Sequence, residues 1–217
     1  MTDFARARHW MVEAQIRTSD VTDHALQDAL RWLPRELFVP ANRQALAYAE
    51  TELEVAPGRY MLRPRDLGKL LQALAPKPTD KALEVFGASG YGAAILAAMG
   101  CQVVLLEPNA ELGKLARAAL DGAQVGGVVL GSSDPLAGWP DAAPYNVILV
   151  NGAVEVVPTA WLDQLAEGGR LGVIERNGPA GQARIYSRSG GIIASRAVFD
   201  AAPPVLPGLA KRVEFTF

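Results

Sequence analysis

The chain has 217 residues, of which half are apolar and 20% are charged, and its net charge is −2. This is the composition of a folded domain without the basic surplus that sequence-independent nucleic-acid binding requires, so we expect no nucleic-acid partner. The single cysteine, Cys101, excludes an intrachain disulfide and a multi-cysteine zinc site, and with only two histidines we expect no metal site.

No apolar run in the sequence has the ~20 residues of a membrane span, and the N-terminal residues lack the apolar segment of a secretory signal. We therefore expect a cytoplasmic protein without a membrane partner. The sequence leaves the oligomeric state open, with a monomer as the simplest expectation.

Residues 1–80 have the pattern of helices separated by prolines. Phe4, Ala7, Met11 and Ala14 recur at helical spacing and predict an amphipathic first helix.

Two further helices are predicted in this half of the chain. Asp20 or Thr22 can cap a second helix, which Pro34 ends. Pro64 suits the first turn of a third helix. The residues expected to face the core are Ala25, Leu26, Ala29, Leu30 and Leu33 of the second helix and Leu67, Leu70, Leu71 and Leu74 of the third.

From residue 81 onward, short apolar runs alternate with helical stretches. Apolar runs that alternate with helices predict a mostly parallel sheet with helices on both faces, which is a Rossmann-like α/β fold. The predicted strands cover 82–86, 102–106, 125–130, 146–150, 170–174, 183–186 and 192–199, with 212–217 as a possible last strand. The predicted helices cover 91–99, 110–120 and 159–165.

The loop after the first predicted strand is the best candidate for a ligand site. It reads Phe-Gly-Ala-Ser-Gly over 86–90 and leads into a helix, and the next strand ends at Glu107. In doubly wound sheets the ligand lies at the carboxyl ends of the strands, where helix N–H groups favour its anionic part. A carboxylate at the next strand end can accept hydrogen bonds from two ribose hydroxyls, so the pattern indicates a nucleotide site. The alternative is an ordinary strand-to-helix turn followed by a surface glutamate.

A family resemblance is carried by the segment PRELFVP at 34–40, followed by ALAY at 45–48. These residues resemble the N-terminal signature of the protein-L-isoaspartate O-methyltransferases, and similar residues continue, in order, to about residue 175. The resemblance implies a methyltransferase domain over 81–217, preceded by a helical extension and substrate loop over 1–80, in one compact unit. It also implies the cofactor S-adenosylmethionine, and methylation of the side carboxylate of isoaspartyl residues in damaged proteins.

The resemblance also implies a set of cofactor contacts. These would be Glu84, Phe86, Gly87, Ala88, Ser89, Gly90, Glu107, Pro108, Ser133, Asp134 and Asn151. Trp139 could line an adenine pocket, or it could simply fill the space between a loop and the sheet.

Three departures from the family pattern predict altered activity. Phe86 and Ala88 replace two of the three glycines of the cofactor loop, and the position of the family's catalytic serine falls on Leu62, which cannot donate a hydrogen bond. The aspartate expected after the third strand is absent or displaced to Asp134. We therefore expect weakened cofactor binding and slow methylation of isoaspartyl peptides.

The expected chemistry needs no general base, because a carboxylate is already ionised at neutral pH. The protein mainly has to align the carboxylate with the methyl group. Arg59, Tyr60 and Arg63 stand in the altered substrate segment and are the candidate catalytic residues, since arginine can hold a carboxylate through two hydrogen bonds. The alternative is a solvated basic segment.

Three functions therefore remain open on the sequence alone. The first is methylation of protein or peptide carboxylates at isoaspartyl residues. The second is a non-catalytic binding or regulatory relative that keeps the fold, and the third is a methyltransferase that acts on another carboxylate.

Overall fold

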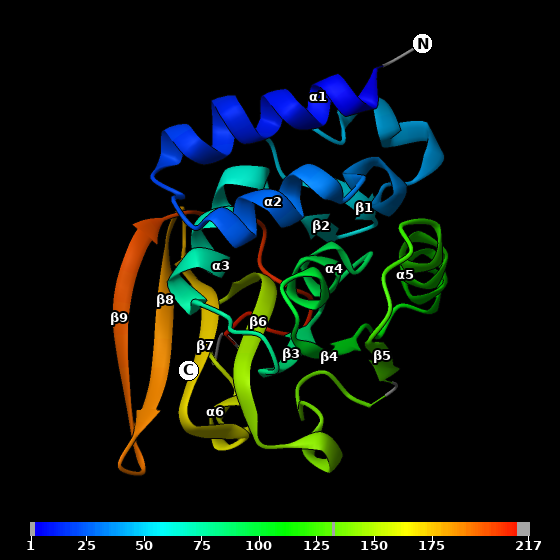
Figure 1. The fold of residues 1–217 in the computed structure, drawn as a ribbon. Coiled ribbons are helices and arrows are strands. Elements are labelled where there is room, and N and C mark those ends of the chain that lie inside the picture. The colour runs from blue at the N-terminus through cyan, green and yellow to red at the C-terminus, as the bar shows by residue number, and fades with distance from the viewer. Residues whose placement is uncertain (1–2, 132, 212–217) are drawn as a thin grey trace, which may run out of the picture.

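A computed structural model describes residues 3–131 and 133–211 of the chain. Its centre is a seven-stranded sheet with the order β5-β4-β3-β6-β7-β8-β9, and β1 and β2 form a separate hairpin (Figure 1). The strands are β1 (Leu53–Ala56), β2 (Arg59–Met61), β3 (Lys81–Val85), β4 (Gln102–Leu106), β5 (Val128–Gly131), β6 (Tyr145–Val154), β7 (Leu165–Asn177), β8 (Ala180–Ser189) and β9 (Ile192–Asp200).

β5, β4, β3, β6 and β7 run parallel to one another, whereas β8 is antiparallel to β7 and β9 is antiparallel to β8. The chain passes from β3 to β4 and β5 on one side, then returns to β6 on the other side of β3. The strand order therefore reverses between β3 and β6, which is where doubly wound sheets bind their ligands. This arrangement confirms the predicted mostly parallel Rossmann-like sheet.

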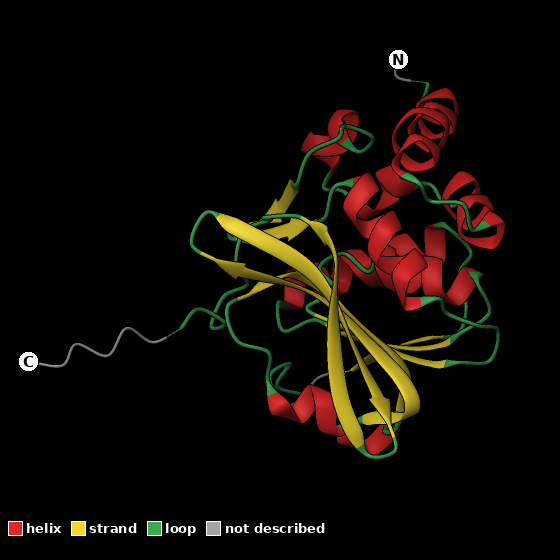
Figure 2. Ribbon diagram, turned by 90° about the vertical axis from the view of Figure 1, so that its left-hand side faces the viewer, coloured by secondary structure: helices red, strands yellow, loops and turns green. Residues whose placement is uncertain are grey.

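Most helices cover one face of the sheet (Figure 2). They are α1 (Phe4–Met11), α2 (His24–Trp32), α3 (Pro64–Leu74), α4 (Tyr91–Ala98) and α5 (Ala110–Gly122), with the short helices η1 (Val12–Ile16), η2 (Arg17–Ser19), η3 (Arg35–Phe38) and η4 (Ala41–Leu46). Buried residues of the N-terminal helices and of the sheet form one continuous apolar cluster, which runs from Met11 through Leu74 to Leu105.

A second apolar cluster covers the opposite face. Its outer layer consists of α6 (Thr159–Asp163), η5 (Pro140–Ala142) and the segment 203–209, from which Trp161, Leu206 and Leu209 are buried against the sheet. Helices therefore lie on both faces, as predicted, but those of the second face are short.

The buried face of the first helix differs from the predicted one. Met11 is buried and Phe4 and Ala7 pack against the core, but Ala14 is exposed, and Ile16 is buried instead. The reason is a change of winding, because α1 passes into the π-helix η1, whose longer turn shifts the buried positions.

The next two helices agree closely with the sequence. The apolar stripe of α2 is buried apart from Ala25, and its cap is Asp23, whose carboxylate accepts the Leu26 N–H at 3.0 Å, rather than Asp20 or Thr22. α3 begins at Pro64 and buries all four predicted leucines.

The strands from β3 onward occupy the predicted places, most of them with longer bounds. The β1–β2 hairpin was not predicted, because its strands have only four and three residues and mix charged with apolar side chains. The predicted strand over 212–217 lies outside the described residues. Within the described part of the chain, no helix combines the length and apolarity needed to cross a membrane.

Candidate cofactor and substrate site

The β3–α4 loop keeps a backbone shape that normally belongs to glycine. Phe86 and Ala88 have φ angles of 54° and 53°, in the left-handed region that side chains with a Cβ rarely adopt. Each such residue costs of order 1–2 kcal/mol, which the surrounding packing must offset. The Phe86 ring finds its place in the second apolar cluster and is 4% exposed, and Ala88 is completely buried.

Glu84 supports this loop from within the core. Its carboxyl group is fully buried and accepts the Ala93 N–H at 2.7 Å. A Cβ added to Gly87 would lie 2.8 Å from this carboxyl group, and one added to Gly92 would lie 2.2 Å from it, so both glycines are required by packing. Burial raises the pKa of Glu84 to about 8, and the group is therefore mainly protonated at neutral pH. The structure thus places Glu84 against the backbone of the loop and of α4.

Glu107, at the end of β4, forms a buried ion pair with Arg59 of β2. The Arg59 guanidinium donates from Nη1 to Glu107 Oε1 at 2.6 Å and from Nη2 to Oε2 at 2.7 Å. The Arg59 side chain is 5% exposed and the Glu107 side chain is 1% exposed. This is the two-pronged geometry in which arginine holds a carboxylate most strongly.

Two backbone amides donate to the remaining acceptor positions of the Glu107 carboxylate. The Asn109 N–H donates to Oε1 at 2.9 Å, and the Ala88 N–H donates to Oε2 at 2.8 Å. A carboxylate has about four acceptor positions. Together with Arg59, these two amides fill all of them, so the predicted ribose-binding carboxylate is already saturated by the protein.

Two other predicted cofactor contacts lie buried with unused hydrogen-bonding capacity. Ser89 is fully buried and Asn151 is 5% exposed. Among the described residues, Ser89 Oγ and Asn151 Oδ1 have no hydrogen-bond partner. Buried polar atoms of this kind usually have a partner, so these two atoms are exceptions at the predicted ligand edge.

The remaining predicted contacts lie in loops at the same edge of the sheet. Ser133 Oγ donates to the Gly138 carbonyl at 2.7 Å, and the Asp134 carboxylate accepts the Leu136 N–H at 3.0 Å, so both stabilise the turn after β5. Pro108 lies in the loop after β4, next to Glu107. Trp139 packs against the second cluster and beside the backbone at Gly131, which favours a space-filling role for its ring.

The three candidate catalytic residues face different partners. Arg59 binds Glu107, as described above. Tyr60 directs its hydroxyl to Glu54 across the β1–β2 hairpin at 3.4 Å, and Arg63 lies 2.6 Å from the Asp66 carboxylate. In this structure Arg59 and Arg63 are therefore each held by a different carboxylate.

A residue that the sequence analysis did not single out fixes this segment. Arg35 of η3 is completely buried and donates to the Leu62 carbonyl and to the Ala47 carbonyl, both at 2.8 Å. Its guanidinium lies 4.7 Å from the centre of the Tyr91 ring, and burial lowers its pKa. The signal for Arg35 in the sequence is its place in the PRELFVP segment, which carries the family resemblance.

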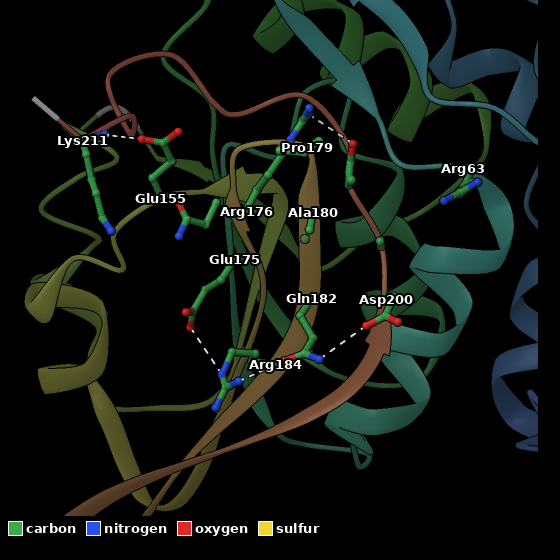
Figure 3. Close-up of a pocket in the computed structure, with 14 residues that line it drawn as sticks. Arg63, Glu155, Glu175, Arg176, Pro179, Ala180, Gln182, Arg184, Asp200 and Lys211 are labelled. Carbon is green, nitrogen blue, oxygen red and sulfur yellow. Dashed lines mark hydrogen bonds and ion pairs between the residues drawn. The ribbon is translucent and has the colours of Figure 1, made fainter. Parts of the chain in front are cut away.

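A cavity of about 880 Å³ opens where β6, β7 and β9 end and β8 begins (Figure 3). Its charged lining has both signs: Arg184 lies 3.7 Å from Glu175, and Arg176 donates to the carbonyls of Ala202 and Pro203. Arg63 stands at one side of this cavity, away from Glu155 and Lys211 (Figure 3). This cavity is not predictable from the sequence, because its walls come from segments that are distant in the chain.

The described residues contain neither a cluster that could hold a metal ion nor a readily ionised thiol. No three His, Cys, Asp or Glu side chains in residues 3–131 and 133–211 are grouped so as to hold a metal ion. Cys101 is buried, and its burial raises the pKa of the thiol to about 11, which makes it a packing residue.

The model of the protein-L-isoaspartate(D-aspartate) O-methyltransferase family matches residues 6–195 of the chain. The chain belongs to this family. The match spans the N-terminal helices, the saturated Glu107 site and most of the sheet. The resemblance of the PRELFVP segment to this family is thereby confirmed.

Curated relatives support the same assignment. A protein-L-isoaspartate O-methyltransferase of Methylorubrum populi is 44% identical over 183 residues, which are 84% of each chain. The enzyme of the same name from Koribacter versatilis is 38% identical, over 79% of this chain and 77% of that protein.

Solved structures show the same fold at low identity. One protein-L-isoaspartate O-methyltransferase matches with a TM-score of 0.82 and 21% identity, over 94% of this chain and 67% of that chain. A Plasmodium falciparum protein, described as a putative member of the family in complex with S-adenosyl-L-homocysteine, matches with a TM-score of 0.80 and 16% identity, over 95% and 99% of the two chains.

Proposed function

We propose that this chain transfers the methyl group of S-adenosylmethionine to the side carboxylate of isoaspartyl residues in proteins or peptides, and that it does so slowly. The observation that carries the proposal is the position of Glu107. In a chain of this family, its carboxylate stands at the end of β4, beside the 86–90 loop and next to the reversal of strand order.

The residues at this edge fit the cofactor once Arg59 has left Glu107. Glu107 would then accept the ribose hydroxyls. Ser89 Oγ, in the 86–90 loop, and Asn151 Oδ1, in β6, are buried polar atoms without a hydrogen-bond partner among the described residues. The N-terminus of α4, which follows Gly90, favours the negative charge of the cofactor's carboxylate. S-adenosylmethionine supplies, when bound, a methyl group on a positively charged sulfur.

The protein's own task is to hold the substrate carboxylate. Arg63 supports this role, because it belongs to the substrate segment and also lines the 880 Å³ cavity. Leu62 is buried and donates no side-chain hydrogen bond. A missing preorganised donor costs about 10²–10³ in rate, which is why the proposed reaction is slow.

The test is transfer of labelled methyl from S-adenosylmethionine to an isoaspartyl peptide, with the aspartyl peptide of the same sequence as a control. We expect label only in the isoaspartyl peptide, and a loss of at least tenfold in Glu107→Gln. Label in both peptides, or none above a protein-free blank, would contradict the proposal.

One observation favours a second candidate, a non-catalytic member of the family. The Arg59–Glu107 pair fills the carboxylate that a cofactor would need. For this candidate we expect no methyl transfer to either peptide, at any cofactor concentration.

A further inference from the structure

The Arg59 guanidinium donates to both carboxylate oxygens of Glu107, the residue proposed to accept the ribose hydroxyls of the cofactor. We infer that Arg59 is an internal competitor of S-adenosylmethionine for Glu107, and that this residue sets the cofactor affinity of the chain. The inference rests on the proposed function only in taking S-adenosylmethionine as the ligand of this edge.

The geometry of the carboxylate is the first argument. Two of its four hydrogen bonds come from the backbone at Ala88 and Asn109, which the chain fixes in place. The other two come from Arg59 and are the ones that a side-chain movement can release. A ribose presents two adjacent hydroxyl donors, just as a guanidinium presents two parallel N–H donors. Both groups therefore require the same two acceptor positions on Glu107.

Burial is the second argument. The ion pair is almost completely removed from water, with 5% and 1% of the two side chains exposed. Separation of a buried pair without a replacement is strongly unfavourable, so Arg59 leaves Glu107 only when another donor arrives. Part of the cofactor's binding free energy is then used to displace Arg59 from Glu107, which lowers the cofactor affinity.

The altered 86–90 loop also helps to hold Arg59 on Glu107. The Phe86 carbonyl accepts a hydrogen bond from Arg59 Nη2 at 2.9 Å, and the guanidinium lies 5.2 Å from the centre of the Phe86 ring. Arg59, from the altered substrate segment, and Phe86, from the altered cofactor loop, are therefore in direct contact. Two departures that look independent in the sequence form a single arrangement that keeps Glu107 occupied.

The inference is tested by calorimetric titration of the full chain with S-adenosyl-L-homocysteine. We expect Arg59→Ala to bind it at least tenfold more tightly than the unmodified protein. The matched control is Arg43→Ala, which removes a partly exposed Arg–Glu pair with Glu54 of β1 and should leave the affinity unchanged. Equal or weaker binding by Arg59→Ala would overturn the inference.

A second measurement keeps the test decisive if Arg59→Ala is poorly folded. Arg59→Met retains an unbranched stem and fills more of the same volume, and we expect the same gain in affinity. Millimolar guanidinium ion added to Arg59→Ala, where the truncated side chain leaves room for it, should weaken binding of S-adenosyl-L-homocysteine toward that of the unmodified protein, whereas sodium chloride at equal ionic strength should not. Absence of this guanidinium effect would also contradict the inference.

The outcomes separate this inference from the proposed function. Tighter binding by the variants without any methyl transfer would support the inference and contradict the proposed function. Methyl transfer with equal affinities would do the reverse. No binding by any of the proteins would contradict both.

Discussion

Glu84 is a carboxyl group that the fold keeps largely protonated. Burial raises its pKa from 4.5 to about 8, so the folded chain binds this proton more tightly than the unfolded chain does. The stabilisation that comes from this proton on Glu84 is therefore fully present below the pKa that the carboxyl group has in the unfolded chain. It is lost as the pH rises through about 8. The free energy of unfolding should fall across this range with a slope of up to about 1.4 kcal/mol per pH unit.

Denaturant unfolding of the unmodified protein and of Glu84→Gln, across the range from pH 5 to pH 8, checks this prediction. Glutamine is neutral throughout, so the variant should lose this part of the slope. The same dependence on pH in both proteins would show that Glu84 does not titrate in this range.

Leu62 is the residue whose chemistry departs most directly from the family pattern. Leu62→Ser should raise the rate of methyl transfer to an isoaspartyl peptide by about tenfold or more, because a positioned hydroxyl donor is worth about 10²–10³ in rate. Leu62→Ala is the matched control, since it creates a similar space in the buried site without the hydroxyl. Identical rates for the serine and alanine variants would contradict this role.

At the scale of elements, Arg35 connects η3 with η4 and with the segment before α3. Arg35→Met should lower the free energy of unfolding by about 2–3 kcal/mol, because it leaves the carbonyls of Ala47 and Leu62 without their donor. Arg43→Met, at a partly exposed arginine, should change stability by less than about 0.5 kcal/mol. Urea unfolding of both variants measures the difference in their free energies of unfolding. Similar losses of stability in the two variants would contradict this role of Arg35.

The elements that the sequence predicts well are those whose signal is local. α3 follows from Pro64 and its spaced leucines, and β4 has the predicted bounds because a continuous apolar run ends at a glutamate. The π-helix η1 was not predictable, since no residue in its short sequence marks the change of winding. The β1–β2 hairpin buries Leu53, Val55 and Met61 in the main apolar cluster, and these contacts with distant segments cannot be read from its short sequence.

The candidate site shows the same limit. Glu107 could be placed at the end of a strand, because strand ends and the loop before them are local features. The pairing of Glu107 with Arg59 could not be predicted, because the two residues are 48 positions apart in the sequence and meet only in the folded chain. The cavity lined by Arg63, Glu175 and Lys211 also joins segments that are remote in the sequence.

At the scale of the whole molecule, the fold of the family is retained, while Glu107, at the proposed cofactor edge, is already paired with Arg59. The sheet, its reversal of strand order and the N-terminal helices match solved relatives over more than nine-tenths of the chain. The changes are concentrated where β2, the 86–90 loop and the end of β4 meet. The account therefore depends on whether the cofactor replaces Arg59 on Glu107.

A crystal structure of the protein grown with saturating S-adenosyl-L-homocysteine tests that claim most directly. We predict the ribose hydroxyls on Glu107 and the Arg59 guanidinium displaced from both carboxylate oxygens, with the Ala88 and Asn109 amides still in place. A bound ligand with Arg59 still paired to Glu107 at its present distances of 2.6 and 2.7 Å would contradict the account.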